Sequence, residues 1–471
     1  LSKDDFKAVI LSDFRLINEV RESSLFGRRD VLSGKGSFGI FGDGKELAQI
    51  ALAKVFKDGD FRAGYYRDQT LMMCLGQLTT KQMFAHLYGN PELSAEPSSG
   101  SRQMMNHFGS RLLNEDGTWR NLMEQKNSTS DMACLASNMP RLVGLAQASK
   151  VYRQNKDLSE KKSFSNNGSE IAFGTIGNSS CAEGHFFEAV NAIGVLQVPA
   201  IISVWDDGYG ISVGNEYQMT KSDVSEVLKG FQRDDKGEGF EIFKVKGWDY
   251  PALVDTYEKA EKLAREKHIP SIVHVVEMTQ PTGHSTSGSH ERYKTKERLQ
   301  WEKDYDCLLQ FSNWIINNNI ATKEELDIIN KEVKDFVKKS KKEAVVVAGS
   351  NHVGVQQLAN QLNNLIGAYG STIDFSNPIN LHQSEDAKAL KLAADVAAGK
   401  GPEVLIMMGV NPVYSMPNGA DFAKGLKSIK TSASKSSIDK ETRLIPYIKE
   451  KYIISHSYDK NCLVVDWELD F

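Results

Sequence analysis

The stretch IAFGTIGNSSCAEGHFFEAVNAIGVLQVPAIISVWDDGYG, residues 171–210, decides the fold. It opens with a short apolar run, continues with a helical pattern and then forms a second apolar run, PAIISVW. A similar unit follows, with FEIFKVKG, a helical pattern over residues 250–266 and PSIVHVVEM. Strands that alternate with helices predict a parallel sheet with helices on both faces, and therefore an α/β fold.

Polar residues stand directly after both apolar runs of this stretch. Asn178, followed by the small residues Ser179 and Ser180, ends the first run, and Asp207 stands after the second, 29 residues further on (207 minus 178). Because the carboxyl ends of parallel strands meet at one edge of a sheet, we expect these side chains to lie together. Oxygen ligands suit Mg²⁺, and the first N–H groups of a helix suit phosphate. The pattern indicates a site for a diphosphate and a metal, although an ordinary polar cluster at two strand ends fits the motif equally well.

The composition describes an ordinary soluble globular protein of 471 residues, 40% hydrophobic and 25% charged, with a formal net charge of −4. This charge gives no broad basic surface for nucleic acid. No apolar run reaches the ~20 residues that span a bilayer, and the first residues, LSKDDFKAVI, do not resemble a secretory signal. The five cysteines form no CxxC pair, which favours reduced thiols and a cytoplasmic location over disulfides or a cysteine-held metal.

Three segments are expected along the chain: a first domain over 1–344, a small α/β Rossmann-like segment over 345–430, and a linker with an unassigned tail over 431–471. The first domain is expected to close with a helix over residues 321–343, whose start has a capping box of Thr322 and Glu325. VVVAGS at 345–350 begins the strand–helix pattern of the second segment. A stretch rich in Ser, Thr and Lys then favours a linker.

Four further stretches, together with the polar motif, resemble the alpha subunits of thiamine-diphosphate-dependent 2-oxoacid dehydrogenases, above all the branched-chain type. They occur in the family's order within residues 1 to about 344: YYRD at 65–68, GSRQMMNH at 100–107, MPRLVG at 139–144 and GHSTS at 283–287. The family's motif has an acidic residue after the first strand and an amide after the second, so the two have traded places here. The resemblance implies the thiamine-diphosphate-binding fold.

The resemblance also implies roles for individual residues. The expected metal ligands are the side chains of Asn178 and Asp207 and the carbonyl of Tyr209, which keep one carboxylate and one amide. His284 is implied as the catalytic histidine at the cofactor diphosphate, and Arg67 as a guanidinium fork on the phosphate oxygens. The other implied cofactor contacts are Tyr66, Leu135, Ser179, Ser180 and again Tyr209. The expected cofactors are thiamine diphosphate and Mg²⁺.

Three departures from the family pattern remove contacts to the diphosphate or to the cofactor loop. Ala133 and Cys134 precede Leu135 where the family has Ser-Pro-Leu, Trp205 replaces an arginine, and Gly288 replaces an aspartate. These departures leave open a second hypothesis, a non-catalytic scaffold that keeps the fold and has lost cofactor binding.

Two further signals have competing explanations. Gly-Asp-Gly at 42–44 copies the family's cofactor triplet, but no apolar strand with an amide or acidic pair follows 29 residues after Asp43, where Met72 stands (72 minus 43). We therefore expect a turn that leads into a helix, with Glu46 as a buried glutamate. His107 lies in a matched stretch, and its role stays open between a packed side chain and a ligand contact.

The expected function is oxidative decarboxylation of a branched-chain 2-oxoacid, or of pyruvate, with transfer of the acyl group to lipoyl groups on an acyltransferase core. The resemblance implies a hetero-oligomer with a beta part, which supplies the glutamate that activates the cofactor ring. The 127 residues after Ala344 (471 minus 344) are too few for a beta part, so the chain alone is expected to be inactive. Residues 345–430 instead resemble a fragment of molybdopterin oxidoreductases. That resemblance raises a third hypothesis, an electron-transfer partner, without assigning molybdenum to the chain.

Overall fold

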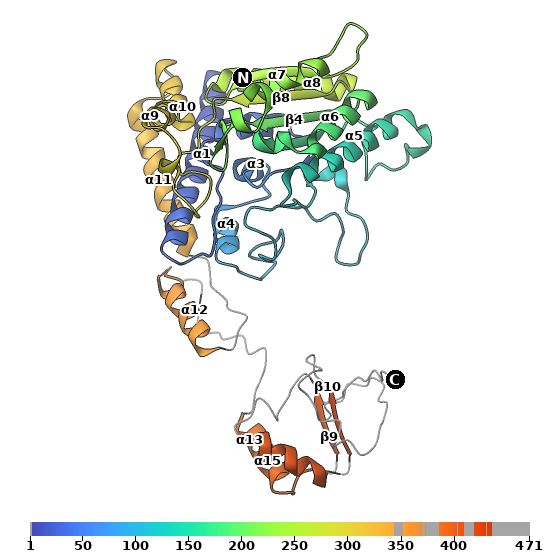
Figure 1. Cartoon of the computed structure of the whole chain (residues 1–471), viewed down its shortest axis with the longest axis vertical. Helices are drawn as coiled ribbons and strands as arrows, with labels where there is room; N and C mark the ends of the chain where they lie inside the picture. The colour runs from blue at the N-terminus through green and yellow to red at the C-terminus, as the bar shows by residue number, and fades with distance from the viewer. Residues whose placement is uncertain are drawn as a thin grey trace. The chain divides into compact units, whose positions relative to one another are not determined.

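The computed structural model describes residues 2–342, 352–365, 367–369, 373, 386–402, 404–408, 419–429 and 431–435. The chain divides into two compact units, Leu1–Phe375 and Ser376–Phe471, each of which is considered by itself (Figure 1). None of the helices in these ranges is long and apolar enough to cross a membrane. The four cysteines in the described ranges are free thiols.

The first unit is built on a six-stranded sheet in the order β2-β1-β3-β4-β8-β7, in which every neighbouring pair is parallel. Its strands are β1 (Phe61–Ala63), β2 (Asn127–Ser128), β3 (Ala172–Gly177), β4 (Ala200–Trp205), β7 (Glu241–Lys246) and β8 (Ser271–Val276). The last four fall on the predicted apolar runs. The sequence pattern does not predict β1 and β2, because strands of three and two residues are too short to show an alternation of hydrophobic and polar positions.

Helices cover both faces of the sheet, and residues of a central strand point alternately into two separate cores. In β4, Ile201 and Trp205 join one core, whereas Ile202 and Val204 join the core on the opposite face. The first core includes residues of α1 (Lys3–Leu32), α2 (Glu46–Val55), α8 (Tyr250–Lys267) and α10 (Cys307–Asn317), and the second includes residues of α5 (Asn138–Gln154) and α6 (Gly184–Leu196). The predicted α/β fold is therefore confirmed.

Two helices from the later part of the first unit, α10 and α11 (Lys323–Lys342), pack on its first helix. In Figure 1, α9 (Lys296–Asp304), α10 and α11 lie together, and α11 contacts α1 along its length. The predicted capping box is present, because the Thr322 hydroxyl accepts from the Glu325 N–H at 3.3 Å and the Glu325 carboxylate accepts from the Thr322 N–H at 2.8 Å. The remaining elements are α3 (Gln69–Cys74), α4 (Thr80–Leu87), β5 (Tyr209–Gly210), β6 (Val213–Gly214), α7 (Val224–Val227) and α12 (Val353–Leu365).

The second unit contains α13 (Asp386–Ala397), β9 (Val404–Met408), α15 (Gly419–Gly425) and β10 (Thr431–Lys435). β9 and β10 pair in parallel, so the predicted linker is wrong for residues 431–435. Backbone pairing with an apolar neighbouring strand fixes a segment whose composition alone is typical of a linker. VVVAGS at 345–350 and the tail after residue 435 lie outside the described residues, and the predicted domain limits at 344 and 430 stay predictions.

A buried group of charges joins β1 to the middle of the sheet. In β1, Arg62 donates from Nε to Asp68 at 2.8 Å, and from its two terminal nitrogens to both oxygens of Asp131 at 3.1 and 2.9 Å. The Asp68 carboxylate also accepts from the Thr175 hydroxyl in β3 and from the Trp205 indole in β4, the latter at 3.2 Å. Burial raises the pKa of Asp68, and the Arg62 charge and the Thr175 hydroxyl act against this rise. These contacts fix β1, β3 and β4 relative to one another.

We predict that Asp68→Asn destabilises the protein by about 3 kcal/mol, the lower part of the range for a broken buried pair, since Arg62 keeps its second carboxylate. The free energy of unfolding in urea measures the effect. Asp255→Asn is a matched control, because Asp255 forms an exposed ion pair with Lys259, and its loss is expected to change the free energy by less than about 0.5 kcal/mol. Equal effects of the two substitutions would contradict a structural role for the buried pair.

Candidate active site

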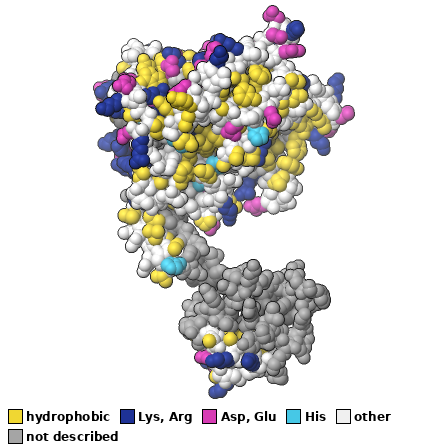
Figure 2. Space-filling model, viewed as in Figure 1, with side chains coloured by type: hydrophobic (Ala, Val, Ile, Leu, Met, Phe, Trp, Pro, Cys, Tyr) yellow, Lys and Arg dark blue, Asp and Glu magenta, His cyan; other side chains and the backbone are white. Residues whose placement is uncertain are grey.

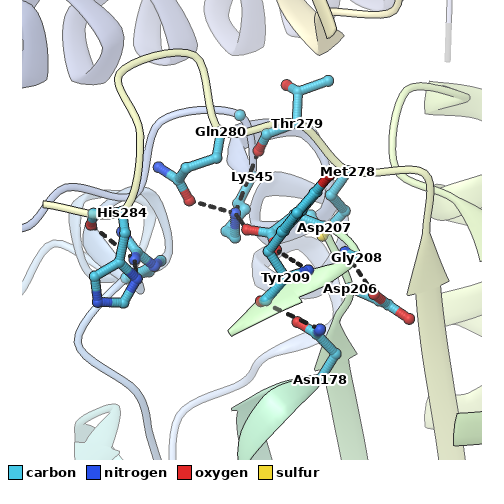
Figure 3. Close-up of polar contacts among 12 residues, drawn as sticks. Lys45, Asn178, Asp206, Asp207, Gly208, Tyr209, Met278, Thr279, Gln280 and His284 are labelled. Carbon is cyan, nitrogen blue, oxygen red and sulfur yellow. Dashed lines mark hydrogen bonds and ion pairs between the residues drawn. The ribbon is translucent and has the colours of Figure 1, made fainter. Parts of the chain in front are cut away.

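The candidate site lies at the carboxyl ends of β3 and β4. The two strands pair so that Gly177 lies opposite Trp205, and the polar residues follow directly after both strands. The predicted proximity is present, because the Asn178 side-chain amide donates to the Tyr209 carbonyl at 3.3 Å and the Tyr209 N–H donates to Asp207 Oδ1 at 3.1 Å (Figure 3). The role of these three residues as metal ligands stays a prediction.

Asn178 belongs to a chain of hydrogen bonds that leads away from the edge of the sheet. Its amide nitrogen also donates to Asn215 Oδ1 at 2.6 Å, and the Asn215 amide donates to Asp206 Oδ1 at 3.1 Å. Asp206 Oδ2 lies 2.9 Å from His274 Nε2, and His274 Nδ1 lies 2.7 Å from the Ser225 hydroxyl. The amide nitrogen of Asn178 is thus engaged with two protein oxygens.

Asp207 forms an ion pair with a lysine at the start of α2. The Nζ atom of Lys45 lies 2.9 Å from Asp207 Oδ2, 2.6 Å from Gln280 Oε1 and 3.2 Å from the Thr279 carbonyl, and Figure 3 shows it between these groups. Only 1% of the Lys45 side chain is exposed. Burial acts to raise the pKa of Asp207, but the Lys45 ammonium and the Arg67 guanidinium outweigh it and the pKa is lowered. Burial lowers the pKa of Lys45 against the attraction of Asp207.

Arg67 and His284 form a second polar group beside Asp207. Arg67 uses Nε on the Tyr65 hydroxyl at 3.1 Å and Nη1 on the Phe41 carbonyl at 2.6 Å. Its Nη2 lies 2.9 Å from both the His284 carbonyl and His284 Nδ1. Four of the five guanidinium N–H groups are therefore directed at protein atoms. Arg67 fixes the loop that carries His284, in addition to bringing a positive charge to the edge.

The tautomer of His284 follows from its contact with Arg67. Because a guanidinium can only donate, Nδ1 of His284 accepts and the proton of the neutral ring is on Nε2. Burial, and then the charge of Arg67, lower the pKa of His284 from 6.5 to about 4. At neutral pH the ring is uncharged and has one N–H group that can donate to an anion.

The other residues predicted from the first matched stretches lie near this group. Tyr66 stacks against His107 with ring centroids 6.2 Å apart, and the Arg67 guanidinium lies 5.2 Å from the centroid of the Tyr66 ring. Nε2 of His107 is buried and has no hydrogen-bond partner within the described ranges. Leu135 begins a short 3₁₀ turn and packs against the first core.

The serines after β3 lie in a tight turn ahead of the helix. Ser179 and Ser180 belong to a 3₁₀ turn over Ser179–Ala182, and α6 starts only at Gly184. The Ser179 hydroxyl donates to Gln218. Their predicted role as cofactor contacts stays a prediction.

The Gly-Asp-Gly triplet at 42–44 forms a turn that enters α2, as predicted. Gly44 has a φ of +88°, and a Cβ atom there would lie 2.1 Å from the Thr279 carbonyl oxygen, so only glycine permits this approach. Asp43 accepts from the Thr282 N–H at 2.8 Å, and Glu46 is fully buried in an ion pair with Arg21 at 2.7 Å. The triplet therefore packs against residues 279–282 at the start of α2.

The contacts at this edge do not fit a divalent metal. Asp207 Oδ2 is occupied by the Lys45 ammonium at 2.9 Å, and the Tyr209 carbonyl accepts from the Asn178 amide nitrogen. A buried ammonium beside the carboxylate also repels a second cation. Among the described residues, no group of three or more His, Cys, Asp or Glu side chains is placed to hold a metal ion.

The same edge does suit an anion. Arg67, Asp207, His284, Tyr293 and Lys294 are among the residues around a cavity of about 10 Å³, which is room for roughly one water molecule. Lys294 is paired with the buried Glu302 at 2.7 Å and Asp207 with Lys45 at 2.9 Å, so Arg67 supplies the excess positive charge, and the neutral His284 ring adds a donor. The donor chemistry fits a diphosphate, although the cavity has to widen to admit one.

Sequence reasoning missed three residues that contact the predicted ligands and their neighbours. These residues are Lys45, Gln280 and Asn215, and none belongs to a motif with a recognised spacing. The one usable signal was the position of Lys45 between the Gly-Asp-Gly turn and the buried Glu46, because a lysine between two buried positions is itself expected to be buried and paired.

A parallel α/β sheet with polar residues and buried cations at the carboxyl ends of its central strands agrees with the thiamine-diphosphate-binding fold that the resemblance predicts. Residues 27–348 match the dehydrogenase E1 component family, and the chain belongs to that family. The resemblance to the alpha subunits of thiamine-diphosphate-dependent 2-oxoacid dehydrogenases is therefore confirmed.

Curated relatives agree with this family. The chain is similar to the 2-oxoisovalerate dehydrogenase subunit alpha of Bacillus subtilis, with 25% identity over 66% of this chain and 83% of that protein. It is 30% identical to the pyruvate dehydrogenase E1 component subunit alpha of Rickettsia bellii, over 39% of this chain and 52% of that protein. A mitochondrial 2-oxoisovalerate dehydrogenase subunit alpha of Arabidopsis thaliana is 26% identical over 67% of this chain and 58% of its own length. None of these matches supports the molybdopterin resemblance of residues 345–430, which stays a prediction.

We predict that His284 makes the folded protein sensitive to mild acid. Its pKa is about 4 in the folded chain against 6.5 unfolded, so stability is complete above about pH 6.5 and falls as the pH drops towards 4. His284→Gln should lose less stability between pH 7 and pH 4.5 than the parent, as measured by urea unfolding at both values. His185→Gln, at an exposed position, is the control. An identical pH dependence in parent and His284→Gln would contradict the neutral buried ring.

Proposed function

We propose that this chain is the alpha component of a 2-oxoacid dehydrogenase that binds thiamine diphosphate at the carboxyl ends of β3 and β4. The observation that supports this most directly is the Arg67–His284 pair beside Asp207, where donors and positive charge face one cavity. The family match supplies the class of reaction, the oxidation of a 2-oxoacid. Branched-chain 2-oxoacids are the proposed substrates and pyruvate is the alternative, since relatives named for both match the chain.

The residues of the chain have separate tasks in this proposal. Arg67 holds the His284 loop and attracts the diphosphate, and His284 donates from its neutral Nε2–H to a phosphate oxygen. His107, whose buried Nε2 lacks a partner within the described ranges, is proposed as a further contact, because leaving such an atom unpaired costs about 1–3 kcal/mol. When bound, thiamine diphosphate supplies the electron sink that permits loss of carbon dioxide.

A partner is proposed for the surface next to the site. The β5–β6 hairpin that follows Asp207 carries Ile211, which is 64% exposed, and Tyr217 just after it is 82% exposed. Figure 2 shows hydrophobic side chains reaching the surface of the larger unit in several places on the face drawn. We propose that a beta-type subunit covers this region and completes the site, that a lipoylated acyltransferase core accepts the acyl group, and that the assembly is cytoplasmic.

A specific observation favours a second candidate, a scaffold that has lost the cofactor. The cavity is only about 10 Å³, and Lys45 occupies the Asp207 carboxylate. Both features are expected of a site that its own side chains have closed. Calorimetric titration with thiamine diphosphate separates the two candidates, because a scaffold gives no binding heat and an alpha component does.

We predict that Arg67→Lys weakens thiamine diphosphate binding although the charge is kept. The single nitrogen of an ammonium cannot replace the three separate nitrogens of the planar guanidinium, which contact the Tyr65 hydroxyl, the Phe41 carbonyl and His284, so both the loop and the phosphate contact are weakened. The expected loss is about 1.5–3 kcal/mol, the value of one charge-assisted contact, or roughly a 10- to 100-fold rise in the calorimetric Kd. Arg153→Lys, on the exposed side of α5, is the control. An unchanged Kd for Arg67→Lys would exclude Arg67 from the binding site.

We also predict that the purified chain releases no carbon dioxide by itself from 3-methyl-2-oxobutanoate or pyruvate in the presence of thiamine diphosphate. The proposed site lacks the residues that a beta-type subunit brings. Adding a cognate beta-type subunit is expected to start decarboxylation, measured with an artificial electron acceptor. Sustained turnover by the chain alone would overturn the division of labour between two parts.

A further inference from the structure

The charge beside Asp207 comes from the chain itself. Lys45 is 1% exposed and its ammonium lies 2.9 Å from Asp207 Oδ2, 2.6 Å from Gln280 Oε1 and 3.2 Å from the Thr279 carbonyl. An ammonium has three N–H donors, and here all three have an oxygen acceptor. The Lys45 ammonium is therefore surrounded by three oxygen atoms, which together form the oxygen cage of this site.

The cage around Lys45 is built by the surrounding backbone and is not a chance contact of a flexible side chain. The amide nitrogen of Gln280 donates to the Asp43 carbonyl at 3.1 Å, which turns Oε1 towards the ammonium. Gly44 permits the Thr279 carbonyl to approach the start of α2, where any Cβ atom would lie 2.1 Å from its oxygen. These contacts hold the ammonium at one position.

We infer that Lys45 is the resident cation of this site and takes the place of the divalent metal beside Asp207, so that the chain binds a diphosphate without a metal ion. The inference rests on the proposed function, because it concerns how the same edge holds thiamine diphosphate. Lys45 neutralises Asp207, which would otherwise repel phosphate oxygens. Arg67 then gives the cavity a net positive charge, because Lys294 is already paired with the buried Glu302 at 2.7 Å, and His284 supplies the neutral donor.

The site needs this arrangement because Asp207 stands where a phosphate would approach. A bare carboxylate there would oppose an anion, and a carboxylate with a bound Mg²⁺ would attract one. The Lys45 ammonium cancels the repulsion between Asp207 and a phosphate. Its three N–H groups all donate to protein oxygens, so none is left for the phosphate. The site therefore has one unit of positive charge less than a site with a bound Mg²⁺, and Arg67, which lines the cavity, supplies the attraction for the phosphate.

The test compares thiamine diphosphate binding to the full chain by calorimetry in two buffers, one with excess EDTA and one with excess Mg²⁺. The expected result is the same Kd in both, within about twofold, because no bound metal contributes a charge-assisted contact, which would be worth about tenfold or more. Binding that is lost in EDTA and restored by Mg²⁺ would overturn the inference and leave the proposed function intact. The absence of binding in both buffers would overturn the proposed function, and with it the inference that depends on it.

Removal of the lysine gives a second readout that does not require turnover. Lys45→Met frees the Asp207 carboxylate, so its thiamine diphosphate binding is expected to become tighter in Mg²⁺ than in EDTA by about tenfold or more, the value of a charge-assisted contact. Mn²⁺ paramagnetic resonance should detect metal bound to Lys45→Met with inorganic diphosphate, and none bound to the parent. Lys54→Met is the matched control, because Lys54 lies on the same helix and pairs with Asp13 away from the site. Metal dependence in the parent equal to that in Lys45→Met would count against Lys45 as the resident cation.

Discussion

The buried ion pair of Arg62 and Asp68 is the constraint on which the carboxyl edge of the sheet depends. Two charges without solvent stabilise a fold only when every donor and acceptor has a partner, and here the partners come from β1, β3, β4 and the loop at Asp131. A shift of β3 or β4 along its neighbour would remove a hydrogen bond to the buried Asp68 carboxylate. The register of three strands is therefore fixed by one cluster, in addition to the apolar cores on the two faces.

The cluster also positions the site, because Asp68 follows Arg67 directly in the chain. The Asp68 carboxylate accepts from the Tyr65 N–H at 3.1 Å, which closes the turn that contains Arg67. With its backbone fixed, Arg67 reaches the Phe41 and His284 carbonyls and orders the loop opposite β4. Asp68, which holds the strands together, and Arg67, which lines the site, are thus neighbours in the sequence and belong to the same turn.

The fold was predictable from sequence where the pattern was long and local. The two strand–helix–strand units around residues 171–205 and 240–278 each carry apolar runs of several residues, and the structure places strands on all four runs. β1 and β2 were not predictable, because their few residues gain strand structure only from pairing with β3 and with each other. Strand β10 shows the same limit, since its Ser- and Thr-rich sequence becomes a strand through its apolar neighbour β9.

The site was predictable in its geometry and not in its charge. Both strand ends were visible in sequence, so the proximity of Asn178 to the residues after β4 followed from the topology alone. The two motif segments alone predict one carboxylate ligand and one amide ligand, with a total charge of one negative unit towards a metal. This prediction of the local charge is incomplete, because the Lys45 ammonium, 162 positions away in the chain, pairs with Asp207. Family membership therefore sets the fold and the class of chemistry, whereas the cation beside the carboxylate depends on a single residue of a neighbouring turn. A close relative with a neutral residue at that position could keep the same fold and the same reaction and still need a metal.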